Sequence, residues 1–122
     1  MIKRKKDNII RDFFLKEKRA LLVTGARQVG KTFSIRRVGK ECFEHFVEIN
    51  FVDKPEALTL FGEAKGAEDF LMRLSAFTNR RLEPGKTLIF FDEVQECKEI
   101  VTAIKFLVDE GSYRYVMSGS PT

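Results

Sequence analysis

The chain has 122 residues, 43% of them hydrophobic and 33% charged, which is typical of a single compact globular domain. Its apolar runs, such as 20–23 and 88–91, are far shorter than the ~20 residues that span a bilayer, which excludes a transmembrane helix. The net charge of +4 allows an acidic partner such as a nucleic acid but does not argue for one.

The N-terminal residues 1–6 are basic, but no apolar signal core follows them, so we expect a cytoplasmic protein. Cys42 and Cys97 do not have the spacing of metal ligands, and we expect both to be reduced thiols. His45 is the lone histidine, and with no second ligand at a useful spacing it is expected to be structural. The many phenylalanines are expected to fill the core rather than to stack on bases.

Helical and strand patterns alternate along the chain, and this alternation predicts an α/β fold with a mostly parallel sheet. Continuous apolar runs predict strands covered on both faces, and apolar residues at helical spacing predict amphipathic helices. Gly111 is expected to end the last helix. The predicted helices are 7–18, 31–40, 55–61, 67–82 and 98–110, and the predicted strands are 20–24, 43–51, 87–91 and 113–117.

The segment 25–32 matches the phosphate-binding pattern G-x-x-x-x-G-K-[ST] at every fixed position. It directly follows an apolar strand and opens a helix, which is the context that the pattern requires. The sequence therefore predicts a P-loop that holds ATP. The predicted nucleotide-binding residues are Gly25, Ala26, Arg27, Gln28, Val29, Gly30, Lys31 and Thr32.

Each fixed position of this loop has a chemical reason. The glycines allow a tight turn whose N–H groups converge on anionic oxygens, and the following helix points its positive end at the same place. Lys31 is expected to reach the β- and γ-phosphates, and Thr32 to offer its hydroxyl to Mg²⁺. Arg27 occupies an unconstrained position, where it is either exposed or in contact with a phosphate or a neighbouring subunit.

Two carboxylates follow the most apolar predicted strand, at the edge of the sheet where a parallel fold also places the phosphate loop. Asp92 is suited to hold Mg²⁺ through water. Glu93 is suited to orient or deprotonate the water that attacks the γ-phosphate. Plain turn residues are the alternative, which the presence of the phosphate loop disfavours.

This Asp-Glu pair is typical of P-loop ATPases in which an extra strand separates the phosphate-loop strand from the acidic strand. The strand 113–117 is the candidate for it, and Ser118, Gly119 and Ser120 follow. A hydroxyl of Ser118 or Ser120 is predicted to sense the γ-phosphate or to position the water. A Ser-Gly turn without such a role is the alternative.

Several segments together resemble a prokaryotic AAA+-like ATPase family, largely of uncharacterised proteins with a C-terminal domain of unknown function. They are Gly-Ala-Arg-Gln-Val-Gly-Lys-Thr, Ile-Asn-Phe at 49–51, Phe-Phe-Asp-Glu-Val-Gln and Met-Ser-Gly-Ser. The resemblance implies a three-layer α/β/α core with the sheet order 5-1-4-3-2. It also implies that Ser118 or Ser120 is the polar sensor residue.

Members of that family are longer, so we expect residues 1–122 to be the N-terminal ATPase core with strands one to four and no lid. An arginine finger and a second sensor are not assigned. The apolar strand 20–24 would then be a sheet edge, which favours aggregation or self-association.

Three functions fit these features. The first is an ATPase that binds Mg·ATP, activates water through Glu93 and moves a lid or partner. The second is a nucleotide-binding switch without significant hydrolysis. A small-molecule kinase is disfavoured because Asp92 and Glu93 suit water activation. The client, whether nucleic acid or protein, is not indicated.

Overall fold

A computed structural model describes residues 21–24, 29–63 and 65–119 of the chain. The helix expected over 7–18, the loop residues 25–28 and Ser120 lie outside these ranges. No helix within them is both long and apolar enough to cross a membrane. The elements are β1 (Leu21–Thr24), α2 (Val29–Cys42), β2 (His45–Asn50), η1 (Pro55–Ala57), α3 (Leu58–Glu63), α4 (Ala67–Thr78), β3 (Thr87–Asp92), η2 (Val94–Glu96), α5 (Ile100–Glu110) and β4 (Arg114–Gly119).

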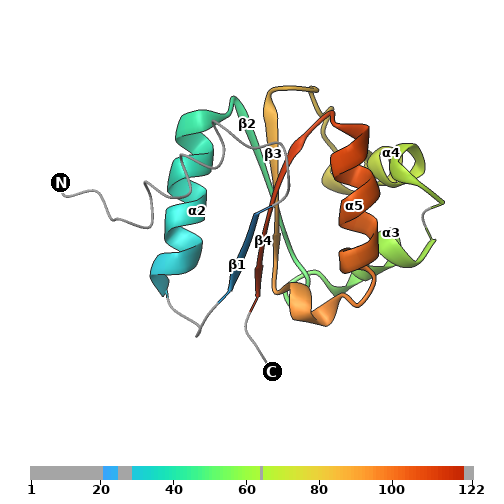
Figure 1. Cartoon of the computed structure of the whole chain (residues 1–122), viewed down its shortest axis with the longest axis horizontal. Helices are drawn as coiled ribbons and strands as arrows, with labels where there is room; N and C mark the ends of the chain where they lie inside the picture. The colour runs from blue at the N-terminus through green and yellow to red at the C-terminus, as the bar shows by residue number, and fades with distance from the viewer. Residues whose placement is uncertain (1–20, 25–28, 64, 120–122) are drawn as a thin grey trace.

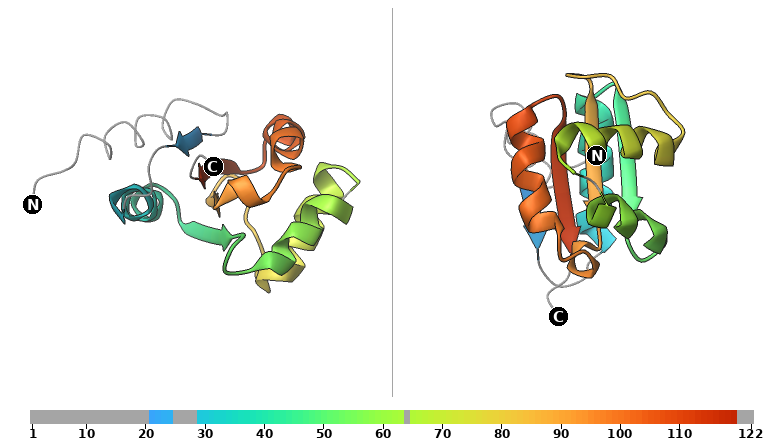
Figure 2. Two further views of the ribbon diagram at one scale, coloured as in Figure 1. Left: turned by 90° about the horizontal axis from the view of Figure 1, so that it is seen from below. Right: turned by 90° about the vertical axis from the view of Figure 1, so that its right-hand side faces the viewer.

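The strands form one parallel sheet in the order β1-β4-β3-β2. Helix α2 covers one face, and α3, α4 and α5 cover the other, which gives the expected three layers (Figure 1). Figure 2 shows the same separation of α2 from the other helices. The predicted order is confirmed for these strands. Among the described strands β1 pairs with β4 alone, so it is an edge, as expected.

The central strand β3 is buried along its whole length, because helices cover both faces of the sheet. Successive side chains of a strand point to opposite faces. Leu88 and Phe90 therefore pack in the layer with α2, whereas Ile89 and Phe91 pack in the larger core with α3, α4 and α5. The continuous apolar run that predicted this strand thus reflects two separate cores, one on each side.

Phe91 is the centre of an aromatic cluster in the larger core. Its ring centroid lies 5.5 Å from that of Phe61 and 6.0 Å from that of Phe51. Phe70 and Tyr115 each lie 6.3 Å away. Aromatic pairs at such separations contribute about 0.5–1.5 kcal/mol each beyond the area they bury. The expectation that phenylalanines fill the core is confirmed for these described residues.

Helix α4 ends at Thr78, so the prediction that it continues to residue 82 is wrong. Asn79 has the left-handed backbone conformation (φ 54°, ψ 40°), and its N–H bonds back to the carbonyl of Ala76. Asparagine tolerates this conformation, which closes a helix. Gly111 ends α5 in the same way (φ 83°), as predicted. The helix expected over 55–61 begins as the 3₁₀ turn η1 before it becomes α3.

Candidate functional site

The carboxyl ends of the parallel strands carry a row of polar residues. Asn50, Asp92 and Ser118 are aligned in register on β2, β3 and β4. They continue the alternation that places Leu88 and Phe90 on the side of α2, so their side chains belong to that same face. Helix α2 begins at this edge of the sheet (Figure 1). The row therefore lies at the edge of the sheet where β1 ends and α2 begins.

The carboxylate of Asp92 is buried, with 8% of the residue exposed, and it is held from two directions. Its Oδ1 accepts a hydrogen bond from the Glu93 N–H at 2.9 Å, and its Oδ2 accepts one from Nδ2 of Asn50 at 3.5 Å. Its backbone carbonyl accepts the Phe51 N–H at 3.1 Å. A buried carboxylate of fixed orientation is a suitable oxygen ligand for Mg²⁺ or for its water shell.

Glu93 has a left-handed backbone (φ 58°, ψ 46°), which is uncommon for a glutamate. The sharp change of direction ends β3 and starts the 3₁₀ turn η2. A non-glycine residue in this region costs about 1–3 kcal/mol and persists only where the surroundings impose it. Within the described residues the only other such case is Asn79, which closes a helix. Glu93 instead precedes the 3₁₀ turn η2 and directly follows the buried Asp92.

Ser118 is fully buried, and its Oγ has no hydrogen-bond partner among the described residues. It lies within β4, beside Asp92, and not in a turn after the strand. Buried hydroxyl groups nearly always have a partner, so one without a partner calls for an explanation. A bound phosphate or an ordered water would supply the missing bond.

Gly119 lets the turn after Glu93 pack against the end of β4. A Cβ added at this glycine would lie 2.7 Å from Oε1 of Gln95 and 3.0 Å from Cγ2 of Val94. The Gln95 amide can move aside, but the Val94 methyl and the Val94 backbone N at 3.3 Å leave little room, so a larger residue would require a shift of a few tenths of an ångström at η2. No local sequence pattern indicates this role, because it depends on packing between segments that are distant in the chain.

Arg36 on α2 forms a two-pronged ion pair with Glu48, with both N–O distances at 2.7 Å. Glu48 precedes Asn50 on the same face of β2. The hydrogen bond to Glu48, together with the negative charges of Glu48 and Asp92, raises the pKa of Arg36, while burial acts in the opposite direction. The charge of Asp92 thus acts on a guanidinium group of the helix that begins at the candidate site.

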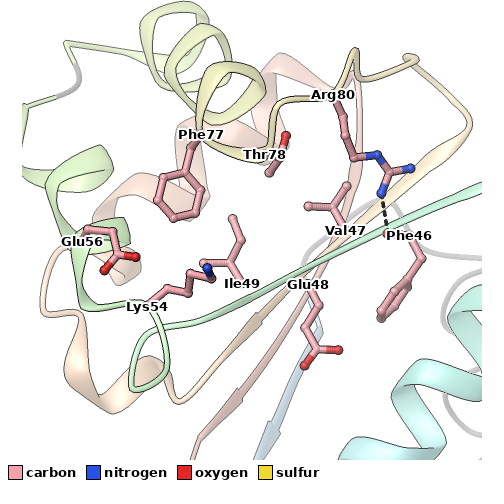
Figure 3. Close-up of a pocket in the computed structure, with 9 residues that line it drawn as sticks. All are labelled: Phe46, Val47, Glu48, Ile49, Lys54, Glu56, Phe77, Thr78 and Arg80. Atoms are coloured by element: carbon pink, nitrogen blue, oxygen red, sulfur yellow. Dashed lines mark hydrogen bonds between the residues drawn. The ribbon is translucent and has the colours of Figure 1, made fainter.

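A pocket of about 450 Å³ lies along the outer edge of β2, not at the candidate site (Figure 3). Val47, Ile49 and Phe77 form apolar walls, and the Arg80 guanidinium donates to the Phe46 carbonyl at 3.2 Å. None of the residues that line it was predicted to bind nucleotide.

The remaining titratable candidates are also separate from the row. His45 Nε2 lies 3.1 Å from Oε2 of Glu83, which is 38 residues away in the chain and which no local spacing indicates. Glu44 completes a group whose ligand atoms lie within 4.8 Å of one another. This group lies at the opposite end of β2, and Lys86 pairs with Glu44 at 3.6 Å. Burial raises the pKa of Cys97 to about 11, so its thiol is protonated at neutral pH.

The phosphate loop itself is only partly described. Gly25, Ala26, Arg27 and Gln28 lie outside the described residues. Val29, Gly30, Lys31 and Thr32 form the first turn of α2, and their backbone is described as helical. The helix starts at Val29, two residues before the predicted start at Lys31 and within the predicted phosphate loop 25–32.

Comparison with known proteins gives one family match. The model of a family described as an AAA domain matches residues 17–122, which include every described element. No curated protein gives a significant match.

The missing hydrogen bond of Ser118 makes a prediction about stability. Ser118→Ala removes a buried hydroxyl that bonds to nothing described, so the free energy of unfolding should not fall and should rise by about 1 kcal/mol or more. Thr87→Val is the matched control, since that buried hydroxyl donates to the Glu83 carbonyl at 2.9 Å. It should lose about 1 kcal/mol or more. Urea denaturation measures both, and an equal loss in the two variants would contradict the assignment.

Proposed function

The chain belongs to the AAA domain family, and from this premise we propose that it binds Mg·ATP at the carboxyl edge of its sheet and hydrolyses it. The observation that carries the proposal is the row of Asn50, Asp92 and Ser118, in register and on the side of α2. This edge combines a buried carboxylate, a buried hydroxyl that has no partner in the described part of the chain, and the start of a helix. Groups of these kinds bind the phosphates of a nucleoside triphosphate and its cation.

In this proposal the phosphates lie on the loop 25–32 and the first turn of α2. The converging N–H groups and the positive end of the helix attract the anionic oxygens. Lys31 contacts the β- and γ-phosphates as a compact positive charge. The sequence pattern supports this part of the site.

Thr32 and Asp92 would hold Mg²⁺, the first through its hydroxyl and the second through its carboxylate or an intervening water. The fixed and buried carboxylate of Asp92 fits this ion, which prefers oxygen ligands in rigid geometry. When bound, the ion neutralises charge on the phosphate oxygens.

Hydrolysis requires a water that attacks the γ-phosphorus while the bond to the bridging β,γ-oxygen breaks. Glu93 accepts a proton from that water or orients it. Its strained backbone sets the direction in which its side chain leaves the main chain. Ser118 donates its free hydroxyl to the γ-phosphate or to the water. Ser120 is the alternative donor proposed from the sequence and lies outside the described residues.

A nucleotide-binding switch without significant hydrolysis is the alternative function. Both functions share the binding site, and multiple turnovers separate them. An arginine finger is not assigned to this chain. Self-association through the edge strand β1 is proposed as a further property, because no other described strand covers its outer side.

Binding is tested with a fluorescent ATP analogue. Lys31→Ala should weaken Mg²⁺-dependent binding by about tenfold or more, because a charge-assisted contact to phosphate contributes about 1.5–3 kcal/mol. Lys40→Ala, on the exposed last turn of the same helix, is the matched control and should bind as the wild type does. Equal affinities of wild type and Lys31→Ala would contradict the proposed loop site.

Turnover is tested by release of inorganic phosphate. The wild-type chain alone should release phosphate repeatedly but more slowly than about one per second, because an arginine supplied in trans typically adds about 10³–10⁵-fold to turnover. Glu93→Gln should keep nucleotide affinity and lose about 10²–10⁴-fold in turnover. Glu96→Gln, an exposed glutamate of the same turn, should leave the rate unchanged.

Repeated release that persists in Glu93→Gln would remove this residue from the catalytic role. Nucleotide binding without repeated release by the wild type would favour the switch.

A further inference from the structure

Asn50 connects the turn after β2 to the carboxylate of Asp92. Its Oδ1 accepts hydrogen bonds from the N–H groups of Val52 at 2.8 Å and Asp53 at 3.1 Å. Its Nδ2 donates to Oδ2 of Asp92 at 3.5 Å. One amide side chain thus closes a turn with its oxygen and reaches the neighbouring strand with its nitrogen.

These partners permit a single orientation of the amide. The backbone groups of Val52 and Asp53 are donors, so they require the oxygen, and a carboxylate accepts only from the nitrogen. The reversed amide would point donors at donors and an oxygen at an anion. The turn therefore aims the N–H groups of Asn50 at Asp92.

The backbone around Asn50 is anchored as firmly as its side chain. Asn50 and Asp92 are register partners on adjacent strands. The Phe51 N–H donates to the carbonyl of Asp92 at 3.1 Å, and the Lys54 N–H donates to the carbonyl of Asn50 at 2.9 Å. The separation between the amide and the carboxylate is therefore set by the sheet and not by a flexible loop.

We propose that Asn50 is a positioning residue for the divalent-cation site, which it serves by fixing the Asp92 carboxylate before Mg·ATP arrives. This inference rests on the proposed function. The Glu93 N–H donates to Oδ1 at 2.9 Å and Nδ2 of Asn50 donates to Oδ2 over a longer 3.5 Å, so both carboxylate oxygens have a donor that favours this orientation. A carboxylate accepts about four contacts through its two oxygens, so these hydrogen bonds are compatible with the cation or its water. Groups that orient a metal ligand in this way typically contribute 10–100-fold to metal affinity.

Closing the turn does not by itself require an asparagine. A serine hydroxyl accepts the same kind of backbone hydrogen bond, although more weakly. An aspartate would also close the turn but would face Asp92 with a second negative charge. The turn uses only the amide oxygen of Asn50, whereas the bond to Asp92 uses the amide nitrogen. A substitution can therefore remove the nitrogen donor and keep the turn closed.

The experiment measures affinity for a fluorescent ATP analogue across a Mg²⁺ titration and again in EDTA, for wild type, Asn50→Ser and Asn50→Ala. Both variants should need about tenfold more Mg²⁺ for half-maximal binding, with affinity in EDTA unchanged. The two shifts should be equal although Asn50→Ala, which cannot close the turn, melts at a lower temperature. Asn79→Ser is the matched control: it disturbs the end of α4, on the other face of the sheet, and should alter melting alone.

Each outcome has one meaning. A wild-type Mg²⁺ requirement in both Asn50 variants would overturn the positioning role and leave the proposed function intact. Shifts that follow the loss of stability, larger in Asn50→Ala than in Asn50→Ser, would reduce Asn50 to a structural residue. No Mg²⁺-linked binding by the wild type would overturn the proposed function, and the inference with it.

Discussion

All four described strands run parallel, and this constraint determines where the polar chemistry of the molecule lies. It brings the carboxyl ends of β2, β3 and β4 to one edge, and the register then sets Asn50, Asp92 and Ser118 side by side. The alternation of side chains turns all of them to the face of α2. Behind this edge the buried aromatic cluster around Phe91 holds the strands in place.

The edge carries costs that the rest of the fold offsets. The buried Ser118 hydroxyl, which has no partner among the described residues, and the strained Glu93, which follows its register partner Asp92, each cost about 1–3 kcal/mol. Only a well-packed sheet maintains such groups. The carboxylate of Asp92 differs from both groups, because it accepts hydrogen bonds from Asn50 and from the Glu93 N–H without a ligand.

Local patterns were enough to predict β3 and the end of α5 at Gly111, because each depends on neighbouring residues. The end of α4 was missed because the helical pattern continues past Asn79, and only the left-handed backbone there ends the helix. The link between Asn50 and Asp92 depends on a strand register between distant segments, which no local pattern contains. The approach of η2 to Gly119 was missed for the same reason.

The central claim is that the cation acts at this edge and not at the cluster of Glu44, His45 and Glu83 at the other end of β2. Paramagnetic broadening of amide NMR signals by Mn²⁺ with ATP tests it most directly, since Mn²⁺ takes the same oxygen ligands as Mg²⁺. We expect broadening at residues 50, 92–93 and 118–119 that requires ATP. Broadening confined to residues 44–45 and 83, or independent of ATP, would contradict the account.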